Sequence, residues 1–167
     1  GEGARVFALV GLGGAGKTAV VAAALASLDP ASRRRVFAWS FYEDPRVEAF
    51  LEALRRAAVV AVVLDGFEVL QSDGRTGRAR GEVEDGRIRN LLRGSATGRN
   101  AFGVVVTTRF DLSGVDDAEG VESVALPPLT EDEAARVLRG WGLTGDVDRL
   151  ARATGGHALS AAMLGSY

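Results

Sequence analysis

Residues 11–18 read GLGGAGKT, between the apolar run Val6–Val10 and the alanine-rich segment Thr18–Leu28. A short apolar run that ends in glycines is typical of a buried parallel strand. The alanine-rich segment predicts a helix that is buried on most sides. Glycines at such a junction let successive backbone N–H groups turn toward an anion at the helix N-terminus. The stretch therefore predicts an α/β fold with a phosphate-binding loop.

The loop fits two nucleotide-binding patterns. As G-x-x-x-x-G-K-T it is a phosphate loop (Walker A), in which Lys17 reaches the β- and γ-phosphates and Thr18 ligates Mg²⁺. As G-x-G-x-x-G it also matches a dinucleotide fingerprint, with Glu43 or Asp44 as the acid on the ribose. The residues expected to contact the nucleotide from the loop and the first helical turn are Gly11, Gly13, Gly14, Ala15, Gly16, Lys17, Thr18 and Ala19.

Lys17 is the single lysine among 20 basic residues. A dinucleotide site needs no cation after its third glycine, whereas a triphosphate site does, so the position of this lysine favours the phosphate loop. A guanine-specific site is expected to contain an N-K-x-D motif. No lysine is left for that motif, so the sequence favours ATP.

Composition sets further limits on function. The chain has 167 residues, of which 47% are hydrophobic and 25% charged, with a net charge of −2, as in a globular domain. The absence of cysteine excludes disulfides, thiolate zinc sites and cysteine nucleophiles. The small net charge gives no reason to expect a nucleic-acid partner. Because no apolar run is long enough to span a bilayer and no signal sequence starts the chain, we expect no membrane partner and a cytoplasmic location.

Alternating strand and helix patterns continue along the chain. Further strands are predicted at Arg35–Phe41, Val59–Leu64, Phe102–Thr108 and Val121–Leu126. Helices are predicted at Arg46–Arg56 and around Ile88–Leu92, and an exposed loop at Gln71–Gly86. The helix ending near Arg56 meets the strand starting near Val59 with almost no connection, which implies either a very tight turn or missing residues.

From Thr130 only helical patterns follow. Thr130-Glu131-Asp132-Glu133 predicts a capping box that opens a helix. Two more helices are predicted at Asp146–Ala153 and Ala158–Leu164. We therefore expect a parallel sheet flanked by helices in residues 1–128 and a small all-α subdomain in residues 129–167. The abrupt end after the last helix is typical of a cut through a larger protein.

Two predicted strands end in polar residues. Asp65 follows the apolar run Val62–Leu64, where a carboxylate partners hydrated Mg²⁺ in phosphate-loop proteins, although it is also compatible with an ordinary strand-end turn. Glu68 is a candidate general base that orients the attacking water, or else a surface residue. Arg109 follows Val104–Thr108 and is a candidate for sensing the γ-phosphate, or else it pairs with a surface acid such as Asp111.

Taken in order, the motifs GLGGAGKT, LDGFE, VVVTTR, LPPLTEDEA and GGHAL resemble those of STAND-class signal-transduction ATPases. This class includes the NB-ARC ATPases and their bacterial relatives, and the resemblance covers nearly the whole chain. The class implies that the T-T-R strand lies between the phosphate-loop strand and the Asp65 strand. It also implies that Pro128 joins the two domains and that a helical subdomain closes over the nucleotide.

The last motif departs from the class pattern. Many members have G-G-x-P-L, with the proline against the adenine, whereas this chain has Ala158 beside His157. The loop ending in His157 is therefore the candidate for the adenine contact. The second acidic position after Asp65 is Gly66, which resembles the D-G-x-[DE] form of NACHT-type relatives and leaves the identity of the catalytic base open.

The resemblance implies an ATP/ADP switch with slow Mg²⁺-dependent hydrolysis, in which Lys17, Asp65, Glu68 and Arg109 carry the chemistry. It also implies effector and sensor domains in the same chain, and homo-oligomers on activation, in signal transduction or defence. Three alternatives stay open. They are a small-molecule kinase with Arg75–Arg89 as lid, an AAA-type ATPase with Arg149 or Arg152 acting in trans, and a non-hydrolysing module locked with ADP.

Overall fold

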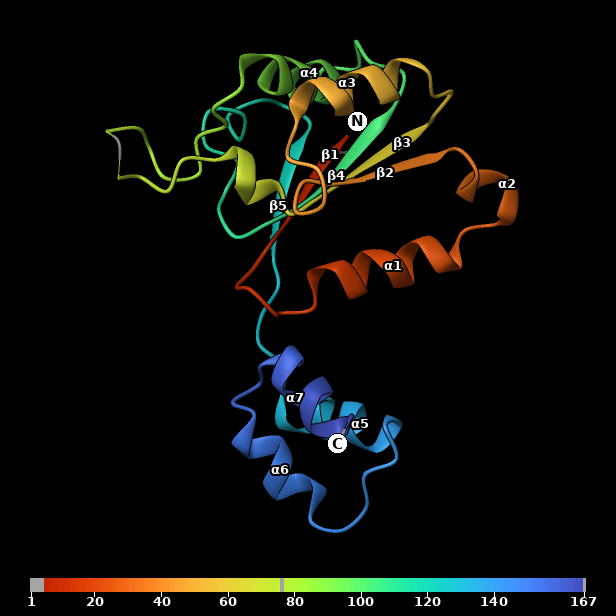
Figure 1. Cartoon of the computed structure of the whole chain (residues 1–167), viewed down its shortest axis with the longest axis vertical. Coiled ribbons are helices and arrows are strands. Elements are labelled where there is room, and N and C mark those ends of the chain that lie inside the picture. The colour runs from red at the N-terminus through yellow and green to blue at the C-terminus, as the bar shows by residue number, and fades with distance from the viewer. Residues whose placement is uncertain (1–4, 76, 167) are drawn as a thin grey trace. The chain divides into compact units, whose positions relative to one another are not determined.

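The structure is a computed structural model, and it describes residues 5–75 and 77–166. The chain divides into two compact units (Figure 1). The first contains the residues up to Val10 and Thr18–Ala125. The second contains Gly11–Lys17 and the residues from Leu126 onward. The domain boundary after residue 128 stays a prediction, whereas these compact units divide after Ala125.

The first unit is built on a five-stranded, entirely parallel sheet with the order β2-β3-β4-β1-β5. This arrangement confirms the predicted α/β class. It also places β4, which carries the T-T-R sequence, between β1 and β3, as the family resemblance implied. The strands are β1 (Val6–Val10), β2 (Val36–Ser40), β3 (Ala61–Asp65), β4 (Gly103–Thr108) and β5 (Val121–Ala125).

The strand register brings the polar strand ends to one edge of the sheet. Leu64 pairs with Val106 and Val10 pairs with Thr108, so β1, β3 and β4 end almost level. In open parallel sheets, ligands bind beyond the carboxyl ends of the strands. The residues that follow β3 and β4 therefore lie where a ligand site is expected.

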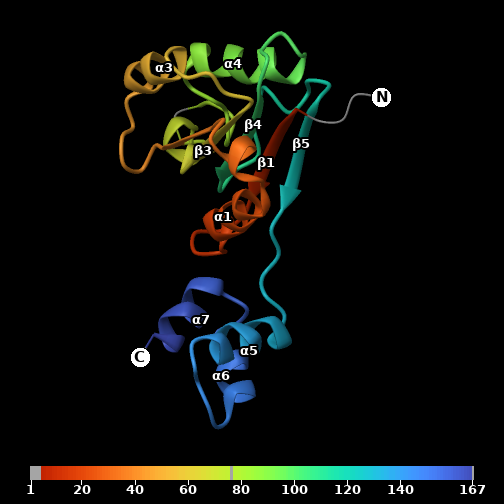
Figure 2. The ribbon, with the colours of Figure 1, turned by 90° about the vertical axis from the view of Figure 1, so that its right-hand side faces the viewer.

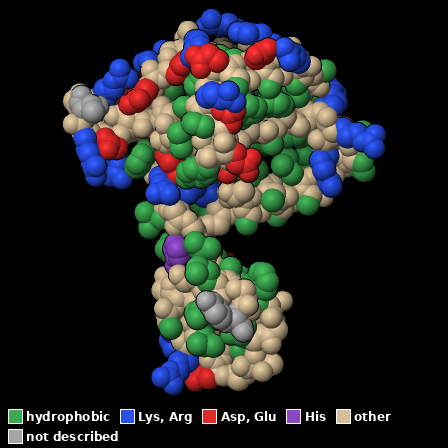
Figure 3. Space-filling model, in the orientation of Figure 1, with side chains coloured by type: hydrophobic (Ala, Val, Ile, Leu, Met, Phe, Trp, Pro, Cys, Tyr) green, Lys and Arg blue, Asp and Glu red, His purple; other side chains and the backbone are tan. Residues whose placement is uncertain are grey.

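One face of the sheet packs against α3 (Val47–Arg55) and α4 (Gly86–Ala96), as Figure 2 shows. α3 buries Phe50 and Leu54, and α4 buries Ile88 and Leu92. These apolar side chains form the main core with β1, β3 and β4. Charged side chains cover the outside of the two helices (Figure 3), where Arg87 on α4 pairs with Glu48 on α3 at 2.8 Å.

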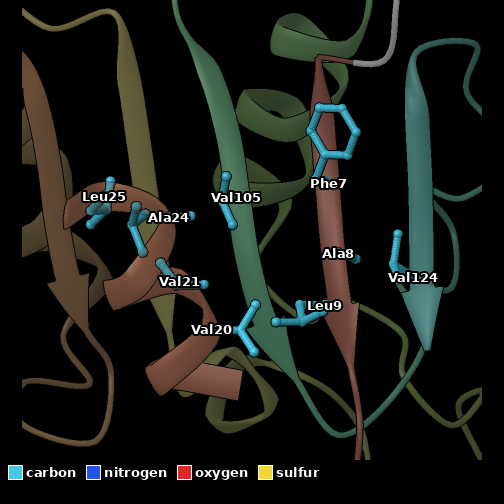
Figure 4. A pocket seen from close by; sticks show the side chains of 10 residues that line it. Phe7, Ala8, Leu9, Val20, Val21, Ala24, Leu25, Val105 and Val124 are labelled. Carbon is cyan, nitrogen blue, oxygen red and sulfur yellow. The ribbon is translucent and has the colours of Figure 1, made fainter. Parts of the chain in front are cut away.

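α1 (Lys17–Ser27) lies against the other face of the sheet (Figure 2). The prediction that this helix is buried on most sides is wrong, because Val21 alone among its residues is buried. Its alanines are too small to fill the space above the sheet. An apolar groove of about 220 Å³ remains there, lined by Phe7, Val20, Val105 and other apolar side chains (Figure 4).

The connections in the first unit refine two sequence predictions. The segment between α3 and β3 spans residues 56–60, and Val60 N–H donates to Arg35 O at 2.9 Å. The stretch 71–86 was predicted to be an exposed loop, but part of it is buried. Gln71 and Val83 form an antiparallel bridge, and both are buried. Two short helices complete the unit, α2 (Pro30–Arg33) and the 3₁₀ helix η1 (Phe67–Leu70).

The second unit contains the three helices predicted after Thr130. They are α5 (Glu131–Gly140), α6 (Val147–Ala153) and α7 (Ala158–Gly165). The predicted capping box is present, with Thr130 Oγ1 accepting from Glu133 N–H and the Glu133 carboxylate accepting from Thr130 N–H. Leu138, Val147 and small alanine side chains form its core. Across residues 5–75 and 77–166, no helix has the length and apolarity needed to span a membrane.

Candidate functional site

Asp65 is the centre of a hydroxyl cluster at the edge of the sheet in the first unit. Its Oδ1 accepts hydrogen bonds from Thr18 Oγ1 at 2.8 Å and from Thr107 Oγ1 at 2.6 Å. Thr107 is buried and also accepts from Gly66 N–H at 3.3 Å. The loop threonine and the strand-end acid, predicted to act together, are thus in direct contact.

Thr107 was not among the predicted site residues, although a signal for it was present. It is the first threonine of T-T-R, and it lies on the strand next to β3. Side chains at the ends of adjacent parallel strands meet at one edge of the sheet. The sequence alone left the strand register open, so it did not assign this hydroxyl to Asp65.

Glu68 and Arg109 form an ion pair beside this cluster. Arg109 Nε lies 2.7 Å from Glu68 Oε1, and the Tyr42 hydroxyl donates to the same oxygen. The Glu68 side chain is only 9% exposed, so the alternative that it is a surface residue is wrong. The acid that pairs with Arg109 is therefore this buried glutamate and not Asp111, which was the surface acid suggested by the sequence.

The second carboxylate oxygen of Glu68 is unusual. Oε2 is buried and has no hydrogen-bond partner among the described residues. Burial and the hydrogen bond to Glu68 raise the pKa of the Tyr42 hydroxyl. Interaction with Tyr42, and then with Glu68, raises the pKa of the Arg109 guanidinium. Tyr42 therefore keeps its proton, and Arg109 its charge, throughout the neutral pH range.

The turn after β3 depends on Gly66. This residue has φ +67°, a left-handed conformation that glycine adopts without strain, and η1 begins directly after it. A Cβ at Gly66 would lie 2.6 Å from Cδ2 of the Tyr42 ring. The glycine therefore lets the chain turn sharply and lets the tyrosine lie close beside it.

Thr108 and Gln71 fix the backbone near Arg109. The Thr108 hydroxyl donates to the Gln71 side-chain oxygen, and both residues are buried. Gln71 Nε2 in turn donates to Gly81 O at 2.8 Å and to Asp111 O at 2.9 Å. Gln71 therefore fixes the backbone segment that carries Arg109, both before it at Thr108 and after it at Asp111.

The loop of the second unit has the conformation that its glycines favour. Gly14 and Gly16 have φ of +74° and +93°. Lys17 Nζ donates to Gly11 O at 2.7 Å and to Leu12 O at 3.0 Å, so the ammonium group folds back over the start of the loop. Ala15 lies close to Gly11, since a Cβ added at Gly11 would lie 3.5 Å from Cβ of Ala15.

The start of α7 holds the same loop. His157 Nε2 lies 2.7 Å from Gly13 O, and its Nδ1 lies 3.0 Å from Ser160 Oγ. Leu159 N–H donates to Gly14 O at 3.0 Å. Gly14 leaves room for the imidazole, because a Cβ there would lie 2.6 Å from His157 Cε1. His157 thus binds the loop itself, and its adenine contact stays a prediction.

The remaining predicted binding residues lie at two places. Pro128 is next to Leu129, whose N–H donates to Gly156 O at 2.8 Å, and a Cβ at Gly156 would lie 3.0 Å from Cβ of Pro128. This contact joins the start of the second unit's helical part to the turn before His157. Ala19 lies in the first turn of α1 and is exposed.

The donor set at Asp65 suits a hard cation. A carboxylate and a hydroxyl are oxygen ligands, and Mg²⁺ is commonly held by one or two carboxylates together with substrate phosphates and water. Within residues 5–75 and 77–166 there is no group of three or more histidine, cysteine, aspartate or glutamate residues that would hold a metal by itself. Thr18 and Asp65 supply two oxygen donors, a set that fits Mg²⁺ only together with further ligands.

Comparison with known proteins gives no family assignment. No protein-family model matches the sequence, and no curated protein matches it significantly. The fold is an α/β parallel sheet with a separate helical unit.

Proposed function

We propose that the chain binds ATP with Mg²⁺, hydrolyses it slowly and acts as a nucleotide-controlled switch. The observation that carries the proposal is the 2.8 Å hydrogen bond from Thr18 Oγ1 to Asp65 Oδ1. It joins the last residue of the phosphate-loop motif to the acid that follows a buried strand, although the two are 47 positions apart. An ordinary strand-end turn gives no reason for this pairing, whereas joint binding of Mg²⁺ does.

Each polar residue has a distinct role in this proposal. Lys17 binds the β- and γ-phosphates, and Thr18 and Asp65 hold the cation. Arg109 binds the γ-phosphate, and Glu68 accepts a proton from the attacking water. Magnesium, when bound, supplies positive charge that offsets the charge of the phosphate oxygens.

The hydrolytic step needs little chemistry from the protein. The water oxygen bonds to the γ-phosphorus while the bond from that phosphorus to the bridging oxygen breaks, which leaves ADP and inorganic phosphate. The proton lost by the water passes to Glu68. Positioning and charge stabilisation supply most of the rate.

The switch role rests on the family resemblance, which implies that a helical subdomain closes over the nucleotide. Homo-oligomerisation with ATP, effector and sensor domains in the same protein, a cytoplasmic location and a role in signalling or defence are further parts of this proposal.

The experiment begins with the purified chain. Mass spectrometry of nucleotide released on denaturation identifies any resident ligand, and phosphate release then measures turnover with Mg²⁺ and ATP. We expect bound ADP or ATP, slow release of phosphate, and preference for ATP over GTP. Release of NAD, or no binding of any nucleotide, would contradict the proposal.

Asp65→Asn tests the residue that carries the proposal. It is expected to weaken binding of Mg·ATP about tenfold, because an amide replaces a charged ligand. Asp116→Asn makes the same chemical change at an exposed position of the first unit, and it is expected to change nothing. Three other results would favour the alternatives. Transfer of phosphate to an acceptor would indicate a kinase, and a stable ring formed with ATP would indicate an AAA-type enzyme. Bound ADP without turnover would indicate a locked module.

A further inference from the structure

The two oxygens of Glu68 have different surroundings. Oε1 takes part in two interactions, one with the Tyr42 hydroxyl and one with Arg109 Nε at 2.7 Å. Oε2 is buried without a hydrogen-bond partner among the described residues. A carboxylate oxygen in such a place needs a donor, because burial without one is costly.

The shape of the first unit explains how Tyr42 reaches this glutamate. Phe41 N–H donates to Asp65 O at 2.9 Å, which extends the β2–β3 pairing beyond the last strand residues. Tyr42 therefore leaves β2 beside the turn at Gly66, and its ring lies where a Cβ of that residue would be. Tyr42 is 56% exposed and its ring lies against the turn at Gly66, so the end of the sheet and this turn place the hydroxyl.

We propose that Tyr42 is a positioning residue for ATP hydrolysis, which together with Arg109 holds Glu68 by one oxygen and leaves Oε2 to accept the proton of the attacking water. This inference rests on the proposed function. Oε2 is buried in the structure, so this role requires that binding of Mg·ATP open it to the attacking water, whose oxygen attacks the γ-phosphorus as its proton moves to the carboxylate. Tyr42 keeps its own proton throughout and touches neither the nucleotide nor the water.

Tyr42→Phe tests the inference, because it keeps the ring and removes only the hydroxyl. The expected result is a fall in kcat of about tenfold, the size expected when a hydrogen bond to a charged group is lost. The affinity for Mg·ATP is expected to stay unchanged. Thr97→Val is the matched control, since it removes a hydroxyl that donates to Arg93 O on α4, away from the cluster.

The pH dependence gives a readout that a structural role would not move. A hydrogen bond donated to a carboxylate favours its charged form. The loss of this hydrogen bond in Tyr42→Phe is therefore expected to move the acidic limb of the kcat–pH profile to higher pH. The Thr97→Val variant is expected to keep the wild-type profile.

A second measurement tests the contact without nucleotide. The chain has two tyrosines, so ultraviolet titration of the wild type and of Tyr42→Phe identifies the Tyr42 signal by difference. Glu68→Gln removes the negative charge that helps to keep Tyr42 protonated. The titration of Tyr42 is therefore expected to shift to lower pH in this variant.

The outcomes separate this inference from the proposed function. If the wild type hydrolyses ATP but Tyr42→Phe keeps both its kcat and its pH profile, the positioning role is wrong and the ATPase assignment stands. An unchanged Tyr42 titration in Glu68→Gln would also overturn the positioning role. A wild-type chain that binds no ATP would overturn the proposed function and this inference together.

Discussion

Gly66 combines two constraints at one residue. It has φ +67°, and the Tyr42 ring occupies the space that a side chain would need, at 2.6 Å from an added Cβ. The residue also starts the turn between Asp65 and Glu68, the two acids of the candidate site. A change at Gly66 therefore acts on stability and on the site at once.

Gly66→Ala is expected to destabilise the first unit by about 2 kcal/mol or more. The left-handed conformation costs roughly 1–2 kcal/mol for a residue with a Cβ, and displacement of the Tyr42 ring adds to this. Gly86→Ala is the matched control, because Gly86 begins α4 and an added Cβ there meets nothing within 4 Å. Urea unfolding followed by Trp39 fluorescence in a Trp141→Phe background measures both, and equal stabilities of the two variants would contradict this expectation.

The capping box of α5 is the clearest element that the sequence predicts. Thr130 and Glu133 exchange hydrogen bonds, and three acidic residues occupy the first turn, where they interact favourably with the helix dipole. Replacing Thr130 by alanine removes one side of the box. Thr130→Ala is expected to lower the free energy of unfolding of the second unit by about 1 kcal/mol, whereas Thr130→Ser retains the cap.

The same box makes the second unit sensitive to acid. Hydrogen bonds from the Thr130 backbone and side chain lower the pKa of Glu133 below its ordinary 4.5. Since the folded-state pKa is the lower one, the stabilisation is complete above about pH 4.5 and is lost as the pH falls through the folded-state value. Trp141 fluorescence in a Trp39→Phe background follows the unfolding of this unit.

A Thr130→Ala variant that is as stable as the wild type at pH 7 would contradict the predicted role of Thr130 as helix cap.

Local sequence patterns predicted the helices and strands well, but they did not predict which side chains meet between elements. Apolar runs and caps identified all five strands and the helices of the second unit, because strand burial and helix capping leave local signals. The sequence also identified Asp65, Glu68 and Arg109 as polar groups at strand ends. The pairing of Thr107 with Asp65 and of Tyr42 with Glu68 depends on strand register and on side-chain packing across the sheet, which no local pattern contains.

Burial is harder to predict from the sequence than element type. The alanine-rich composition of α1 predicted a mostly buried helix, but composition does not say how much of a helix its neighbours cover. In the structure its small side chains leave the groove above β1 and β4. Likewise, the polar composition of residues 71–86 hid the buried pair Gln71 and Val83, which supports the segment near Arg109.

At the scale of the whole molecule, the chain consists of two compact units, and the phosphate-loop motif contributes residues to both. Lys17 clusters with the helical unit, where it bonds to Gly11 O and Leu12 O, while Thr18 bonds to Asp65 in the sheet unit. The sequence predicted the motif and the helical region, and its assignment of the loop to a domain of residues 1–128 stays a prediction. The central claim is that this motif binds a nucleoside triphosphate.

Calorimetric titration of Mg·ATP into the wild type and Lys17→Ala tests that claim most directly. Lys17 is the single lysine of the chain, and loss of its charge-assisted contacts to phosphate is worth a factor of about ten to a hundred in affinity. Arg34→Ala removes an exposed cation elsewhere and serves as the control. The account predicts saturable binding that is weakened by Lys17→Ala and unaffected by Arg34→Ala. Equal affinities of the wild type and Lys17→Ala, or no binding to the wild type, would contradict it.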